Sequence, residues 1–191
     1  MLNAKEQFIE IYTSLIKREG ADKLLEWLER SDFFTAPAST RFHGAHEGGL
    51  VEHSVNVYRR LCELSGGIEG VSVPVPESLA IVALLHDVCK VGMYVTDFRN
   101  QKDERGVWQR VPFYKIEEQM PFGHGEKSVY IISGFMKLTR EEAMAIRFHM
   151  GAWAPEVKGG DSSVSKAFEM YPLALLTHQA DMLASYLDES R

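Results

Sequence analysis

Six side chains of this sequence have the chemistry of metal ligands, and all are imidazoles or carboxylates. In chain order they are His53, His86, Asp87, His124, His149 and Asp181. Mixed nitrogen and oxygen donors suit Mn, Fe, Ni, Co or Zn better than Mg. Such a metal, once bound, polarises a phosphoryl or carbonyl oxygen and activates water. The residue types therefore predict a metal-dependent enzyme.

The pair His86 and Asp87 lies at the end of the apolar segment SLAIVALLHDVCK. An imidazole and a carboxylate beside so many apolar residues cost free energy unless something pairs with them. His53 shares its predicted helix face with Leu50 and Val57, so it too points toward the core. The sequence thus predicts that the ligand candidates are buried.

A single inward histidine or aspartate is usually explained without a metal, as a hydrogen-bonded core residue or an ion-pair partner. Four inward histidines and two aspartates in one small domain would each need a separate partner, because buried polar groups are almost always hydrogen-bonded. One metal centre satisfies all of them together, and we prefer that interpretation.

With these residues in this order, the chain resembles the HD superfamily of metal-dependent phosphohydrolases. The superfamily signature is His…His-Asp…Asp, which falls here on His53, His86, Asp87 and Asp181. The two remaining histidines, His124 and His149, match the pattern of members with a two-metal centre.

The local sequence around these positions carries the same resemblance. GGLVEHS around His53 is similar to the GGL-x-x-H-(S/T) element of many members, including some bacterial exoribonucleases. LLHDVCK is similar to their LLHD-(I/V)-GK element, with Cys89 in place of the usual glycine. PFGHGEKS around His124 resembles small HD-family hydrolases of phages and prophages of Gram-positive bacteria. The resemblance covers residues 40–187.

The resemblance implies an all-α HD-domain bundle with the site in its middle and two divalent transition-metal ions per chain. The first metal would be held by His53, His86, Asp87 and Asp181. Asp87 would bridge to the second, whose other ligands would be His124 and His149. The expected reaction is hydrolysis of a phosphomonoester or phosphodiester by a hydroxide bridging the metals. The substrate would be a nucleotide or another small phosphorylated metabolite.

Lys90 is the further catalytic candidate beside Asp87. It lies three residues after Asp87 and four after His86, so a continuous helix would place all three on one flank. There its ammonium would contact a substrate phosphate. The helix dipole alone also favours a lysine at this helix end, and the resemblance favours the phosphate contact. The expected substrate-binding residues are Lys90, His43, Arg99, Lys115 and Lys127.

The elements that position these residues are mostly helices. Apolar residues at helical spacing predict helices over about 2–18, 22–30, 50–64, 77–90, 125–137, 140–150 and 172–187. Loops are predicted at 33–49 and 151–171. Thr139 and Glu142 have the spacing of a capping box at the start of one helix. The fold class expected is therefore all-α.

Residues 93–116 interrupt the helical pattern. They are rich in β-branched and aromatic residues around a polar centre, which predicts a small β-hairpin inserted into the bundle. Its aromatic and cationic side chains suit a base and its phosphate, so the hairpin could cover the site. The whole chain, 1–191, is expected to form one domain, with N-terminal helices in 1–30 and the motif-bearing core in 40–187.

Composition restricts the partners and the compartment. The chain has 21 Lys and Arg against 27 Asp and Glu, a net charge of −6, which disfavours a stable nucleic-acid partner. No apolar stretch approaches the ~20 residues that span a bilayer. The two cysteines lie in helical patterns rather than a disulfide framework, so a cytoplasmic location is expected. The oligomeric state is left open.

Three other functions share parts of this pattern. Some two-metal HD proteins resemble mixed-valent di-iron oxygenases, whose ligand set is the same. A degenerate HD domain could instead bind a nucleotide without catalysis, although all six ligand positions are filled here. Processive RNA trimming fits poorly with an acidic chain that has no recognisable nucleic-acid-binding domain. Phosphate hydrolysis is preferred because of Lys90 and the cationic hairpin.

Overall fold

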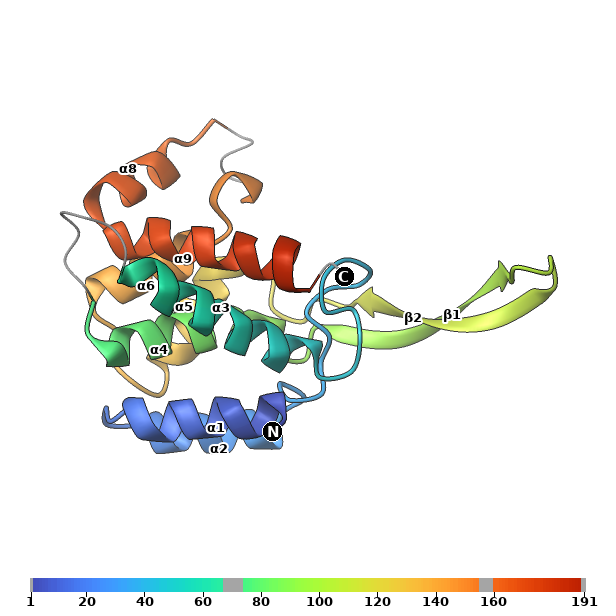
Figure 1. The fold of residues 1–191 in the computed structure, drawn as a ribbon, viewed down its shortest axis with the longest axis horizontal. Helices are drawn as coiled ribbons and strands as arrows, with labels where there is room; N and C mark the ends of the chain where they lie inside the picture. The colour runs from blue at the N-terminus through green and yellow to red at the C-terminus, as the bar shows by residue number, and fades with distance from the viewer. Residues whose placement is uncertain (1, 67–73, 155–159, 190–191) are drawn as a thin grey trace.

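A computed structural model of the chain describes residues 2–66, 74–154 and 160–189. Within these ranges the protein has eight α-helices and one two-stranded antiparallel sheet (Figure 1). The predicted all-α bundle with a small inserted hairpin is therefore confirmed. The described part contains no helix that is both long enough and apolar enough to cross a membrane.

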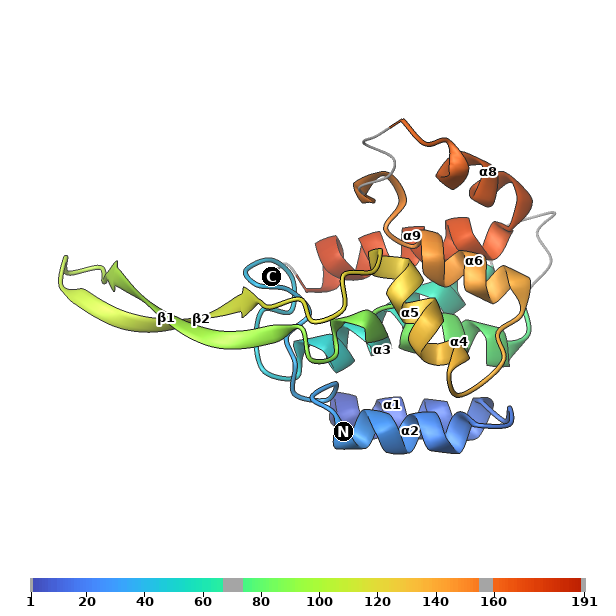
Figure 2. The same ribbon diagram turned by 180° about the vertical axis from the view of Figure 1, so that it is seen from behind.

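Two N-terminal helices form one side of the bundle. α1 (Ala4–Leu15) begins with a capping box built by Asn3 and Glu6, and α2 (Ala21–Arg30) lies beside it in both ribbon views (Figures 1 and 2). α1 packs on α3 (Gly49–Ser65) and α4 (Pro76–Leu85). α1 and α2 bury large apolar side chains against the core and contribute none of the six ligand candidates.

α4 is the central helix of the core. All of its residues from 78 to 85 are buried, and a helix that is apolar on every side is enclosed by its neighbours. α3 and α6 (Arg140–Phe148) pack against it. This burial carries the end of α4, where His86 follows, into the middle of the protein.

The remaining helices complete the enclosure. α9 (Pro172–Leu183) packs against α3 and α6, and α5 (His124–Ser133) packs against α6. α5 and α6 approach closely at Gly125, where a Cβ atom would lie 2.1 Å from the carbonyl oxygen of Arg147. α9 continues into a π-helical turn, η3 (Ala184–Asp188).

Two predicted elements were wrong, the loop at 151–171 and the continuous helix over 77–90. The loop predicted at 151–171 contains the 3₁₀ turn η2 (Gly151–Trp153) and α8 (Ser163–Met170), while residues 155–159 lie outside the described part. α8 buries Val164 and Ala167 in a small apolar cluster with Phe148 of α6. Val164, Ala167 and Phe168 have the helical spacing that could have revealed it.

The helix predicted over 77–90 is not continuous. α4 ends at Leu85, and the chain turns at Asp87 (φ −104°, ψ 15°) into a short 3₁₀ helix, η1 (Val88–Lys90). In 3₁₀ geometry residues three apart lie above one another. Asp87 and Lys90 therefore meet as predicted, but through a tighter turn than the one expected.

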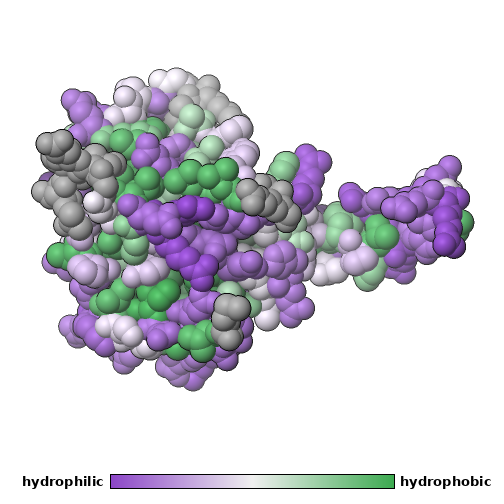
Figure 3. Space-filling model, in the orientation of Figure 1, coloured by the Kyte–Doolittle hydropathy of each residue, from purple (hydrophilic) through white to green (hydrophobic). Residues whose placement is uncertain are grey.

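The hairpin projects from the bundle as a separate arm (Figures 1 and 2). β1 (Tyr94–Lys102) pairs in register with β2 (Trp108–Ile116). Most of its residues are exposed, and hydrophilic side chains cover much of the arm (Figure 3). The arm extends away from the helices instead of folding back over them.

A buried ion pair fixes the helices at the N-terminal end of α4. Glu142 has no exposed surface, and both its oxygens accept hydrogen bonds from Arg18 at 2.6 Å. It also accepts bonds from the Ser78 hydroxyl of α4 and from the backbone N–H of Thr139, closing the predicted capping box of α6. Burial would raise the pKa of Glu142, but the bonds from Arg18 and Ser78 lower it below its usual value.

Replacing Glu142 with Ala should destabilise the fold, because it leaves Arg18 without its buried partner. We expect the free energy of unfolding to fall by about 3 kcal/mol, measured by urea denaturation at pH 7. Because the folded-state pKa is lowered, this contribution is present at neutral pH and is lost as pH falls through that pKa. Glu141→Ala, in the same helical turn, is the matched control. Equal effects of the two substitutions would contradict the role given to the ion pair.

Candidate metal centre

The six predicted ligands come from five places in the bundle, and three of them lie at helix ends. His86 follows the last residue of α4, His124 is the first residue of α5, and His149 follows the last residue of α6. His53 lies in α3 and Asp181 in α9. Packing of these helices brings all six together, as the sequence predicted.

Backbone hydrogen bonds fix the protonation of two imidazoles. Nδ1 of His86 lies 2.8 Å from the Ala83 carbonyl oxygen, and Nδ1 of His149 lies 2.7 Å from that of Ile146. A carbonyl oxygen can only accept, so each Nδ1 must carry the proton. In the neutral tautomer with the proton on Nδ1, the lone pair is at Nε2. Both lone pairs point into the cluster.

His53 is held in a similar way by carboxylates. Its Nδ1 lies 3.1 Å from both oxygens of Glu189, and its Nε2 lies 3.3 Å from Asp181 Oδ1 and 3.2 Å from His86 Nε2. Two imidazole nitrogens at 3.2 Å cannot both present lone pairs without a proton or a cation between them.

Asp87 lies at the centre, and its two oxygens face different ligands. Oδ2 lies 3.6 Å from Nε2 of His53 and 3.5 Å from Nε2 of His86. Oδ1 lies 2.8 Å from Nε2 of His124 and 3.5 Å from Nε2 of His149. The carboxylate therefore divides the histidines into two pairs.

The chemistry of this donor set fits a divalent cation. Nε2 of His149 is buried and has no hydrogen-bond partner among the described residues, although Asp87 Oδ1 is 3.5 Å away. An orphaned buried nitrogen is rare in a folded protein and calls for an explanation. Overlapping groups of three donors, each within 4.8 Å of one another, connect Asp181 to His124 through Asp87. A metal would satisfy the orphaned nitrogen and neutralise the carboxylates.

Protons take the place of the cation when no metal is bound. Burial lowers the pKa of His53, but hydrogen bonds to Asp181 and Glu189 outweigh it and raise the pKa to about 10. Burial also opposes charge on His124, while its contacts with Cys89 and Asp87 raise that pKa to about 9. Metal binding has to displace these protons, so metal affinity should fall as the pH is lowered.

Lys90 lies inside the cluster. Its ammonium is 2.6 Å from Asp87 Oδ2 and donates to the Ala38 carbonyl oxygen at 2.7 Å. Burial disfavours its charge, yet Asp87 raises the pKa of Lys90 above its usual value. The cation predicted to meet a substrate phosphate is thus buried against the central carboxylate.

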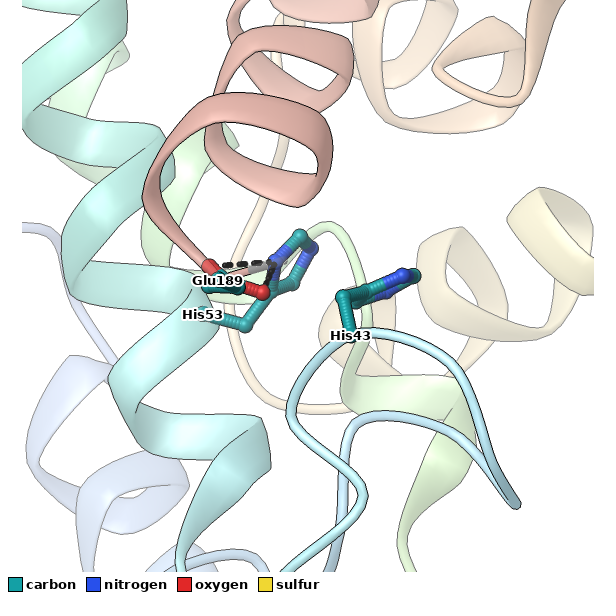
Figure 4. Close-up of side chains that lie close together, drawn as sticks. All are labelled: His43, His53 and Glu189. Atoms are coloured by element: carbon teal, nitrogen blue, oxygen red, sulfur yellow. Dashed lines mark hydrogen bonds and ion pairs between the residues drawn. The ribbon is translucent and has the colours of Figure 1, made fainter. Parts of the chain in front are cut away.

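The other predicted substrate residues are placed unevenly. His43, in the loop before α3, lies beside His53, with ring centroids 5.0 Å apart and planes tilted by 36° (Figure 4). Lys127 is buried and pairs with Glu118 at 2.7 Å. Arg99 and Lys115 lie on the projecting hairpin and contact Phe113 and Glu117 instead. Among the described residues the structure brings only His43 and Lys90 of this set to the ligands.

Two further residues lie beside the ligands. Cys89, which replaces the usual glycine of the LLHD-(I/V)-GK element, has its Sγ 3.4 Å from His124 Nδ1. Glu189 approaches His53 from the end of the last helix, and no sequence pattern singled it out. His178, three residues before Asp181, forms no hydrogen bond to a carboxylate among the described residues. Its Nδ1 instead lies 2.7 Å from the carbonyl oxygen of His149.

Two of the six ligand candidates are partly exposed. The His53, His86, Asp87 and His149 side chains are at most 3% exposed, whereas His124 is 24% and Asp181 15% exposed. A small molecule would therefore reach the cluster past these two residues.

The fold and the site together define a helical protein with a buried histidine and aspartate cluster suited to a divalent metal. The family model of the HD domain matches residues 50–186. This is more than half of the chain, so the chain belongs to the HD domain family, a superfamily of metal-dependent hydrolases. Neither the curated proteins nor the solved structures compared with the chain gave a match.

Metal binding should stabilise the protein, because the unfolded chain lacks the assembled site. With free Zn²⁺ or Mn²⁺ at 100 times its Kd, we expect unfolding to cost about 2.7 kcal/mol more, seen as a higher thermal midpoint than in chelator. Asp87→Asn should abolish this increase. His46→Ala, which changes an exposed histidine, should keep it. Equal increases in both variants would place metal binding elsewhere.

Proposed function

We propose that this protein is a metal-dependent phosphohydrolase that cleaves a phosphomonoester or phosphodiester, with a nucleotide or another small phosphorylated metabolite as substrate. The observation that carries the proposal is the arrangement around Asp87, whose two oxygens face separate pairs of histidines. This arrangement suits two neighbouring metal positions that share one carboxylate.

The residues divide between the two positions as follows. The first would be held by His53, His86, Asp181 and Oδ2 of Asp87. The second would be held by His124, His149 and Oδ1 of Asp87. When bound, such metals supply Lewis acidity toward a phosphoryl oxygen and a nucleophilic water at neutral pH. The protein contributes fixed donors, because the Nδ1 atoms of the buried histidines are already committed elsewhere.

The surroundings favour a small anionic substrate. His124 and Asp181 are the partly exposed ligands of an otherwise buried cluster, so a phosphate group would approach past them. Lys90 has three N–H donors, of which one faces Asp87 and one faces Ala38. We assign the third to a phosphate oxygen. The net charge of −6 disfavours a polynucleotide.

Metal content and a phosphoester screen test the proposal together. Inductively coupled plasma mass spectrometry of the purified protein should find close to two Mn, Ni, Co or Zn ions per chain. A His86→Ala, Asp87→Ala variant should lose them. Hydrolysis of nucleotide and generic phosphoesters should fall by more than about 100-fold in Asp87→Asn. Two irons per chain with oxygen-dependent turnover would contradict hydrolysis in favour of an oxygenase.

Replacing Lys90 with Met tests its role in substrate binding. Methionine keeps an unbranched apolar side chain but removes the charged donor, so kcat/KM should fall at least about tenfold. The metal content should be retained, because Lys90 is not a ligand. Steady-state kinetics beside metal analysis would show this, and unchanged kinetics would remove Lys90 from the mechanism.

A further inference from the structure

The final turn of the described chain brings a carboxylate against a metal-ligand candidate. Both oxygens of Glu189 lie 3.1 Å from Nδ1 of His53, and Figure 4 shows the carboxylate and the imidazole facing each other. The Asn56 side-chain amide, one turn further along α3, donates to Glu189 Oε1 at 3.1 Å. The Glu189 side chain is only 4% exposed, so the carboxylate is enclosed as well as bonded.

The π-helical turn explains why Glu189 occupies this place. In a regular α-helix, the residue seven positions after Asp181 returns to nearly the same face, which would be Asp188. The wider turn over Ala184–Asp188 adds one residue, and the Glu189 N–H bonds the Ala184 carbonyl oxygen five residues back at 3.1 Å. Asp181 and Glu189 therefore face the same histidine, at Nε2 and Nδ1. Such π-turns often occur at functional sites.

Asp188 is directed elsewhere by the same turn. Its carboxylate pairs with Arg60 of α3, with contacts of 2.5 and 2.9 Å. Two adjacent acidic residues thus make different contacts along one helix. Asp188 fastens the end of the chain to the surface of α3, and Glu189 enters the site.

A carboxylate that accepts a hydrogen bond from the ring nitrogen not bound to the metal has a known effect on a ligating histidine. It fixes the ring orientation, keeps the proton on that nitrogen and makes the other nitrogen a better donor to a metal. His86 and His149 receive the same support from backbone carbonyls, which are uncharged. His53 is the member of the cluster supported by a charged group.

We propose that Glu189 is a positioning residue that holds His53 with Nε2 directed at the metal, so that the turn over Ala184–Asp188 and the residue after it are part of the metal centre. This inference rests on the proposed metal-dependent function. The His43 ring also lies against His53, with centroids 5.0 Å apart. Loss of Glu189 would leave His53 in place but free to exchange its proton between the two nitrogens.

Metal affinity tests this role without depending on turnover. Titration calorimetry with Zn²⁺ or Mn²⁺ on the metal-stripped full chain should show Glu189→Ala binding about 10–100-fold more weakly than the unchanged protein. Glu189→Gln retains an oxygen acceptor without the charge, so its metal affinity should lie between that of Glu189→Ala and that of the unchanged protein. Asp188→Asn is the matched control: it removes the same charge one residue away and should bind with the original affinity.

Nuclear magnetic resonance of the imidazole nitrogens gives a readout that a merely structural role would not move. In the metal-loaded protein, the His53 proton should reside on Nδ1, with the strongly deshielded signal of a carboxylate hydrogen bond. That signal should persist in Asp188→Asn and disappear in Glu189→Ala.

The outcomes separate this inference from the proposed function. Unchanged affinity in Glu189→Ala, or equal weakening in Glu189→Ala and Asp188→Asn, would overturn the positioning role while leaving a working metal site. Failure of the unchanged protein to bind either metal would overturn both. A metal affinity that is moderately weakened in Glu189→Gln, more weakened in Glu189→Ala and unchanged in Asp188→Asn would support the role.

Discussion

The structure depends on one electrostatic constraint. Several buried imidazole nitrogens and the Asp87 carboxylate face one another, and in the absence of a cation all of them are hydrogen-bond acceptors. The Nδ1 atoms of His53, His86 and His149 are committed to a carboxylate or a backbone carbonyl, so in the neutral rings the lone pairs lie at Nε2. These lone pairs meet the carboxylate of Asp87 in a region with almost no solvent exposure. A cluster of acceptors is unstable without positive charge. Protons, Lys90 and a divalent metal are the cations that can supply it.

The same constraint explains why Asp87 is connected so widely. Lys90 neutralises one of its oxygens and donates to the carbonyl oxygen of Ala38, which also accepts from the Tyr94 hydroxyl at 3.2 Å. Tyr94 is the first residue of the hairpin. The central carboxylate is therefore linked, through two hydrogen bonds to one carbonyl, to the loop that carries His43 and to the base of the projecting arm.

α4 joins two polar clusters through an apolar interior. Its N-terminal end contributes Ser78 to the Glu142 and Arg18 ion pair, and its C-terminal end delivers His86 to the metal centre. His86 lies eight positions after Ser78, a rise of about 12 Å. Both polar clusters lie at the ends of this helix, and the residues between Ser78 and His86 are all apolar and buried. The metal centre is thereby attached to the most deeply buried helix of the protein.

The sequence by itself determined the helical fold, the inserted hairpin and all six ligand candidates, because apolar periodicity and residue type are local properties of the chain. It also indicated that Asp87 and Lys90 would lie together. Only the tertiary structure revealed how Asp87 divides the histidines, since that depends on helices distant in sequence. It also decided that the hairpin points outward and that Glu189 rather than Asp188 meets His53. A single added residue in a π-turn changes which side chain faces inward, and such a departure from helical periodicity is set by packing against α3.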